Sequence, residues 1–252
     1  MVKKLTVLGI QLNNYSLRDS FLVGEKYFHD DSLNVIRIVT MDQLLEGTRD
    51  DEVKKALEEA DLCVVEDRTI LEEAGINSPG RLNEIKTHEF FPEFMRRVYR
   101  NGRSTFILGE DEESIGKFES FMNESYRHIR IAGTGIISED ESVNEKTLND
   151  INILVPDMVI SILETPVLDK FLNERKNQIY AKLFIALDAN AAGKRKKGLL
   201  TMLSGLFTEG VFKRHAKQMG IDSISPHQRS VENDFQSDSP DDAGWNKGDN
   251  ED

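Results

Sequence analysis

The chain has 252 residues and a mass of 28.7 kDa, enough for one large α/β domain or two small ones. Its 38% hydrophobic and 31% charged residues are typical of a soluble globular protein, which excludes collagen, coiled coils and wholesale disorder. No apolar run reaches the roughly 18 residues of a membrane-spanning helix, and Leu5–Ile10 is too short for an export signal. We therefore expect a cytoplasmic protein. The single cysteine, Cys63, excludes an intrachain disulfide.

The net charge of −13 is unevenly distributed along the chain. Residues 230–252 hold eight acids and one lysine with few aliphatic side chains, so we expect a disordered acidic tail over 221–252. Residues 194–220 hold seven bases and one acid among Leu, Met and Phe, which predicts a basic amphipathic helical appendage. The segment Lys194–Lys217 either lies on an anionic membrane surface or packs on the sheet as an ordinary terminal helix. The acidic remainder disfavours nucleic-acid binding.

Short β-branched runs alternate with amphipathic stretches before residue 193. The expected strands are Leu5–Ile10, Val35–Val39, Leu62–Val65, Thr105–Leu108, Ile129–Ala132, Met158–Leu163 and Leu183–Leu187. The expected helices are Leu17–Phe28, Asp51–Ala60, Phe91–Asn101, Glu112–Glu124, Val143–Asn152 and Val167–Gln178. The alternation predicts a Rossmann-like α/β domain over residues 1–193, with a mostly parallel sheet and helices on both faces.

Local signals mark some of the boundaries. Ser16 precedes the first helix, and Ser142 stands three residues before Glu145, the spacing of a capping box. The stretch Gly75–Arg81, which contains Ser-Pro-Gly, is the clearest interior break and a candidate boundary between two halves of the domain.

Ligands of open α/β sheets bind beyond the carboxyl ends of the strands, so the residues that follow each strand are the candidate site. These residues are Thr40 and Asp42, Glu66–Arg68, Gly109, Gly133–Gly135, Glu164–Pro166 and Asp188–Gly193.

The carboxylate pair Glu66-Asp67 has two interpretations. A carboxylate in an apolar setting can have a raised pKa and act as a general base. Alternatively, Asp67 caps a helix that begins near Thr69, a commonplace role for aspartate. Arg68 either pairs with these acids or meets a phosphate.

The glycines and histidines carry weaker signals. Gly109 permits close approach of a ligand, but four acids follow it at a helix start. Gly133-Thr134-Gly135 is either a phosphate loop or a plain turn. The five histidines lack metal-ligand spacing, and no Walker or Gly-x-Ser-x-Gly sequence is present, so we predict no metal or cofactor.

Several motifs follow one another over residues 5–200: Leu8–Asn14, Ala60–Asp67, Gly102–Gly109, Ile129–Gly135, Leu148–Asn152, Pro156–Val159 and Ala191–Lys196. In this collinear order they resemble the motifs of the WecG/TagA/CpsF glycosyltransferases. The resemblance implies a Rossmann-like domain that moves N-acetylmannosamine or a related sugar from UDP to a polyprenyl-diphosphate-linked acceptor. It also implies that Asp67 is the base, that Thr40 contacts sugar or acceptor, and that a basic appendage docks on the membrane.

The substrate-binding residues expected from the strand ends and the resemblance are Asp42, Arg68, Gly109, Gly133, Gly135, Thr165, Pro166, Asp188 and Arg195. Either Arg68 or Arg195 would face the diphosphate. The expected partners are a UDP-sugar, a lipid-linked acceptor and an anionic membrane surface, with a homo-oligomer left open.

The chain departs from the family pattern on the nucleotide side. The family's Thr-x-Asn reads Thr40-Met41-Asp42, Asp-Gly reads Asp67-Arg68, and Gly-x-Pro-x-Gln-Glu reads Glu164–Asp169. Added carboxylates oppose diphosphate binding, so the alternative is a non-catalytic relative that acts as a partner or regulator of envelope glycan enzymes.

Overall fold

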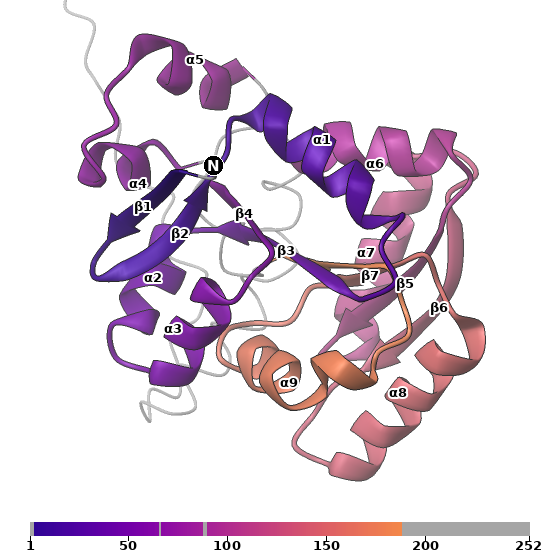
Figure 1. The fold of residues 1–252 in the computed structure, drawn as a ribbon. Helices are drawn as coiled ribbons and strands as arrows, with labels where there is room; N and C mark the ends of the chain where they lie inside the picture. Colours follow the sequence, from indigo (N-terminus) through magenta and orange to yellow (C-terminus); the bar gives the residue numbers. More distant parts are fainter. Residues whose placement is uncertain (1–2, 66, 88–89, 188–252) are drawn as a thin grey trace, which may run out of the picture. The chain divides into compact units, whose positions relative to one another are not determined.

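The computed structural model describes residues 3–65, 67–87 and 90–187 (Figure 1). The basic segment 194–220, the acidic tail 221–252 and the domain boundary at 193 lie outside these residues, as do Glu66, Asp188 and Arg195.

A six-stranded parallel sheet forms the centre of the described residues. Its strands are β3 (Asn34–Val39), β4 (Leu62–Val65), β5 (Ser104–Gly109), β6 (Arg130–Ile136), β7 (Met158–Ser161) and β8 (Leu183–Ala186). They stand in the order β4-β3-β8-β7-β5-β6, and each neighbouring pair is parallel. The predicted parallel α/β fold is confirmed.

The first expected strand, Leu5–Ile10, is wrong. The chain instead forms an antiparallel hairpin of β1 (Lys3–Val7) and β2 (Ile10–Asn14), which is separate from the main sheet. Leu8 and Gly9 both adopt positive φ values, 53° and 77°, as the two-residue turns of hairpins require. The apolar run therefore folds back on itself instead of continuing.

Helices cover both faces of the sheet, as predicted (Figure 1). One face packs against α1 (Leu17–Tyr27), α6 (Phe90–Arg100) and α7 (Glu112–Ser125). The other packs against α2 (Met41–Gly47), α3 (Asp51–Glu58), α8 (Glu141–Leu154) and α9 (Val167–Arg175), the last followed by the short η1 (Lys176–Gln178). Two further helices, α4 (Arg68–Glu73) and α5 (Pro79–Thr87), follow β4.

The helix starts test the capping signals. Ser16 caps α1, because its hydroxyl accepts the amide hydrogen of Asp19. The predicted capping box of Ser142 and Glu145 is wrong: Asp140 is the cap of α8 and accepts from the Ser142 amide. An aspartate two residues earlier takes the same role.

The expected break at Gly75–Arg81 contains a turn at Gly75 and the start of α5. This helix, which was not predicted, holds the beginning of α1. Glu84 Oε1 accepts the Leu17 amide hydrogen at 2.7 Å, and Arg81 donates to the Tyr15 carbonyl at 2.8 Å.

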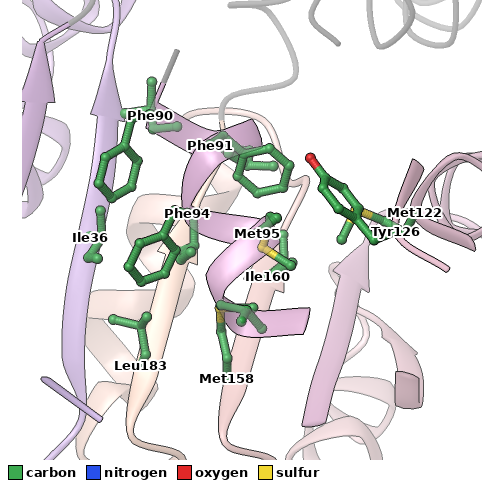
Figure 2. Packing of buried hydrophobic residues seen from close by; sticks show 14 of the residues in the cluster. Ile36, Phe90, Phe91, Phe94, Met95, Met122, Tyr126, Met158, Ile160 and Leu183 are labelled. Atoms are coloured by element: carbon green, nitrogen blue, oxygen red, sulfur yellow. The ribbon is translucent and has the colours of Figure 1, made fainter. Parts of the chain in front are cut away.

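The two faces of the sheet differ in their packing. Ile36 and Ile38 of β3 belong to one unbroken apolar cluster, which we call the continuous face (Figure 2). Its aromatic rings stack in a row: Phe21 on Phe90 at 5.2 Å, Phe90 on Phe94 at 5.0 Å, and Phe94 on Phe28 at 6.1 Å.

The opposite side, which we call the divided face, carries two apolar clusters. Val35 belongs to a cluster with Phe106 and Phe184, and Val39 to one with Leu44 and the hairpin. Alternate residues of a strand share a face, so Arg37 lies between these valines at the division.

Candidate functional site

Candidate residues gather at two junctions between adjacent strands of the sheet. At the β3–β4 junction, β3 leads to α2 and α3 and β4 leads to α4, and all three helices contribute to one cluster of the divided face. At the β7–β5 junction, β7 leads to α9 on the divided face, whereas β5 leads to α7 on the continuous face. Such a divergence marks a switch point, and open α/β sheets bind ligands at the carboxyl edge beside switch points.

The β3–β4 junction brings together the two candidate catalytic residues. Val39 and Val65 are in register, so Thr40 and Asp67 follow the ends of neighbouring strands. Both cap helices: the Thr40 hydroxyl accepts from the Gln43 amide at 3.3 Å, and Asp67 Oδ1 accepts from the Thr69 amide at 2.9 Å. The interpretation of Asp67 as a helix cap is confirmed, and its role as a base stays a prediction.

The other two candidates at this junction lie on the first turns of helices. Asp42 stands in the first turn of α2. Arg68 begins α4, and its Nε donates to Glu72 Oε1 at 2.6 Å with the arginine side chain 69% exposed. An exposed ion pair of this kind contributes about 0 to 1 kcal/mol, so it is too weak to hold the guanidinium away from an anion.

The β7–β5 junction is lined by Gly109, Glu110 and the loop Glu164–Pro166. Glu110 Oε1 accepts the Glu164 amide hydrogen at 3.1 Å, which joins the two strand ends. Pro166, whose bond to Thr165 is cis, stands at the start of α9. A Cβ on Gly109 would come within 2.6 Å of Ile115, so this glycine also serves the packing of α7.

The position expected for Gly133 and Gly135 is wrong, because both lie inside β6 and not after it. A Cβ on Gly133 would lie 2.9 Å from the Phe106 ring, and one on Gly135 would lie 2.4 Å from Thr147 Cγ2. Close packing against Phe106 and α8 therefore explains the glycines, and contact with a substrate stays a prediction.

Arg37 and Asp169 form a buried ion pair that was not predicted from the sequence. Both side chains are fully buried, and Arg37 Nη1 donates to Asp169 Oδ1. Arg37 Nη2 also donates to the Thr165 hydroxyl at 3.3 Å. The missed signal was a charged residue inside an apolar run expected to be a strand covered on both faces, since such a residue needs a buried partner.

The described part of the chain holds no group of three or more His, Cys, Asp or Glu side chains that could bind a metal ion. Within that part, no helix is long and apolar enough to cross a membrane. Cys63 is buried, and its burial raises the pKa of the thiol from 9.0 to about 11. A thiol with so high a pKa is a poor nucleophile at neutral pH.

Comparison with protein families shows which family the chain resembles. The glycosyl transferase WecG/TagA/CpsF family model covers residues 5–192, a range that contains every candidate site residue except Arg195. A search of curated proteins finds no match.

Proposed function

The chain belongs to the WecG/TagA/CpsF glycosyltransferase family, and we propose that it moves an N-acetylhexosamine-type sugar from a UDP-sugar to a polyprenyl-diphosphate-linked acceptor. The setting would be the synthesis of cell-surface glycans. The observation that carries this proposal is the pairing of Thr40 and Asp67 at the carboxyl ends of neighbouring parallel strands, within the range that the family matches.

The proposed chemistry is a displacement at the anomeric carbon. An acceptor hydroxyl forms the new C–O bond while the bond to UDP breaks, and the diphosphate leaves with the electron pair. The Asp67 carboxylate takes the hydroxyl proton, and Thr40 contacts the sugar or the acceptor. Capping α4 does not prevent this role, since a carboxylate has about four lone-pair sites and the Thr69 amide uses one.

The lipid-linked acceptor also suits a protein held at the membrane. We propose that the basic segment Lys194–Lys217 rests on the anionic inner face of the cell membrane, where each basic residue near the surface contributes about 1 kcal/mol. Arg195 in this segment, or Arg68 at the β3–β4 junction, would face the diphosphate.

The test of the base is Asp67→Asn. Asparagine caps helices about as well as aspartate, so the variant should keep its unfolding temperature. Turnover of UDP-sugar should fall about 10²- to 10⁴-fold, the usual contribution of a general base. The matched control is Asp50→Asn at the cap of α3, which should change neither quantity. Equal turnover in Asp67→Asn and the parent would refute the assignment of the base.

The second candidate function is a non-catalytic partner of envelope glycan enzymes. The hydrogen bond from the Glu164 amide to Glu110 favours this second function. The bond holds the Glu110 carboxylate at the β7–β5 junction, where a diphosphate would meet negative charge. Calorimetric titration of the full chain with UDP separates the two functions. A ligand that binds the native state must also stabilise it, so no heat and no thermal stabilisation at millimolar UDP would favour the partner.

A further inference from the structure

The ion pair of Arg37 and Asp169 joins three elements of the divided face. Arg37 is on β3, and Asp169 is in the first turn of α9, while Thr165 lies in the loop that leaves β7. Strand β8 stands between β3 and β7, and its residue in register with Arg37 is Ala186. This small side chain leaves the long arginine room to cross β8.

Burying the pair removes two charged groups from water, which costs free energy of solvation. Arg37 Nε and Asp169 Oδ2 are buried without a hydrogen-bond partner, so neither charged group is fully satisfied. Replacing both members of such a pair with well-packed apolar residues is often neutral or stabilising. The stability of the fold alone therefore does not account for these two residues.

The shape of the guanidinium group explains why Arg37 and Asp169 occupy these positions. Its two terminal nitrogens donate in a fixed fork, Nη1 to Asp169 and Nη2 to Thr165, so one planar group sets the loop and the helix start together. The same strand leads directly into Thr40, the candidate contact for sugar or acceptor. The loop at the β7–β5 junction is thereby fixed relative to the β3–β4 junction.

We infer that Arg37 and Asp169 are positioning residues that hold Thr165 and the Glu164–Pro166 loop in place for nucleotide recognition. The recognition part of this inference rests on the proposed function, whereas the positioning part does not. Arg37 is fully buried and acts through Thr165.

The test is the full-length double variant Arg37→Met, Asp169→Leu. Hydrogen exchange of the Glu164 and Leu168 amides reports on the loop, because the first donates to Glu110 and the second to the Glu164 carbonyl. We expect both amides to exchange about tenfold faster, and the Kd for UDP to rise about tenfold, while the melting temperature is unchanged or higher.

The control is Arg103→Met, Glu25→Leu, which removes a more exposed ion pair attached to α1 and should leave loop exchange and UDP affinity unchanged. Unchanged exchange in the Arg37, Asp169 double variant would overturn the positioning role. Faster exchange with unchanged UDP affinity would overturn the recognition role. Should the parent chain bind no UDP, the proposed function and its recognition part fail, and the exchange rates still decide the positioning.

If the double variant does not fold, Thr165→Val and Thr165→Ser replace it. Valine removes the hydroxyl that accepts from Arg37 and should speed exchange at Glu164 and Leu168, whereas serine keeps the hydroxyl and should restore the parent rate. Equal rates in the two variants would overturn the proposal.

Discussion

The continuous face and the divided face of the sheet solve the same packing problem differently. On the continuous face, stacked aromatic rings and aliphatic residues meet without a buried charge among the clustered side chains. On the divided face, Arg37 and Asp169 separate two apolar clusters. On our inference, the continuous face mainly stabilises the fold, whereas the divided face also positions a loop. Four predictions test that contrast.

The largest effect is expected for Phe94→Ala on the continuous face. Phe94 is fully buried and stacks on two other rings, so its loss should lower the free energy of unfolding by about 4 to 5 kcal/mol. Urea unfolding measures the change. Exchange at Glu164 and Leu168 should keep its parent rate under native conditions; a faster loop would mean that the two faces are not independent.

The next effect is expected for Asp169→Asn on the divided face. The variant keeps the side-chain volume but leaves the Arg37 charge without its counter-charge, which should cost about 3 to 4 kcal/mol. Unlike Phe94→Ala, it should also speed exchange at Glu164 and Leu168. A loss of stability without faster exchange would assign the pair to packing alone.

A pH titration of Cys63 probes the divided face near Arg37. Cys63 is on β4, in register with Arg37 on the neighbouring strand β3. The pKa of the thiol is raised from 9.0 to about 11 in the fold, so the folded state holds its proton more tightly than the unfolded state. This contribution is fully present below pH 9 and is lost as the pH rises to 11, a fall of about 2 to 3 kcal/mol at most.

The measurement is urea unfolding at pH 8, 9, 10 and 11. Burial raises the pKa of the Tyr27 hydroxyl as well, so the fall is compared in Cys63→Ala and Tyr27→Phe. The cysteine variant should lose less stability between pH 9 and 11 than the parent. Identical pH profiles would contradict the contribution of Cys63.

The smallest effect compares two glycines on opposite sides. Gly135→Ala on the divided face places a Cβ against Thr147 and should cost about 1 to 2 kcal/mol. Gly116→Ala in α7 meets no atom within 4 Å and should instead stabilise by about 0.5 to 1 kcal/mol. Differential scanning calorimetry reads both shifts. A stable Gly135→Ala would leave the packing of β6 against α8 unexplained.

Much of the fold follows from sequence patterns because its strands are continuous apolar runs. The run Val35–Val39 predicted β3 to within one residue, and Ser16 marked the first helix. The hairpin was missed because Leu8 holds an uncommon positive φ, which its side chain does not signal. The helix α5 was missed because Ser78-Pro79-Gly80 reads as a turn, although proline is well placed at a helix start.

The candidate site was predictable only where it follows strand ends. Thr40, Asp67 and Thr165 follow their strands as expected. The link between Arg37 and Asp169 was not predictable, because the two residues are 132 positions apart and no local pattern records a contact of that range. The positions of Gly133 and Gly135 were predicted wrongly because glycine weakens a strand locally, so the strand was expected to end before them. In the structure, pairing with β5 continues β6 through both glycines.

The order in which the strands are made adds a consequence for biosynthesis. Strand β3 leaves the ribosome early, yet its neighbour β8 and the counter-charge of Arg37 are translated near the end of the described chain. At about 5 to 20 residues per second, Arg37 waits on the order of ten seconds for Asp169. A nascent chain halted before α9 therefore leaves the β3 edge that pairs with β8 open, with Arg37 still hydrated and without its counter-charge.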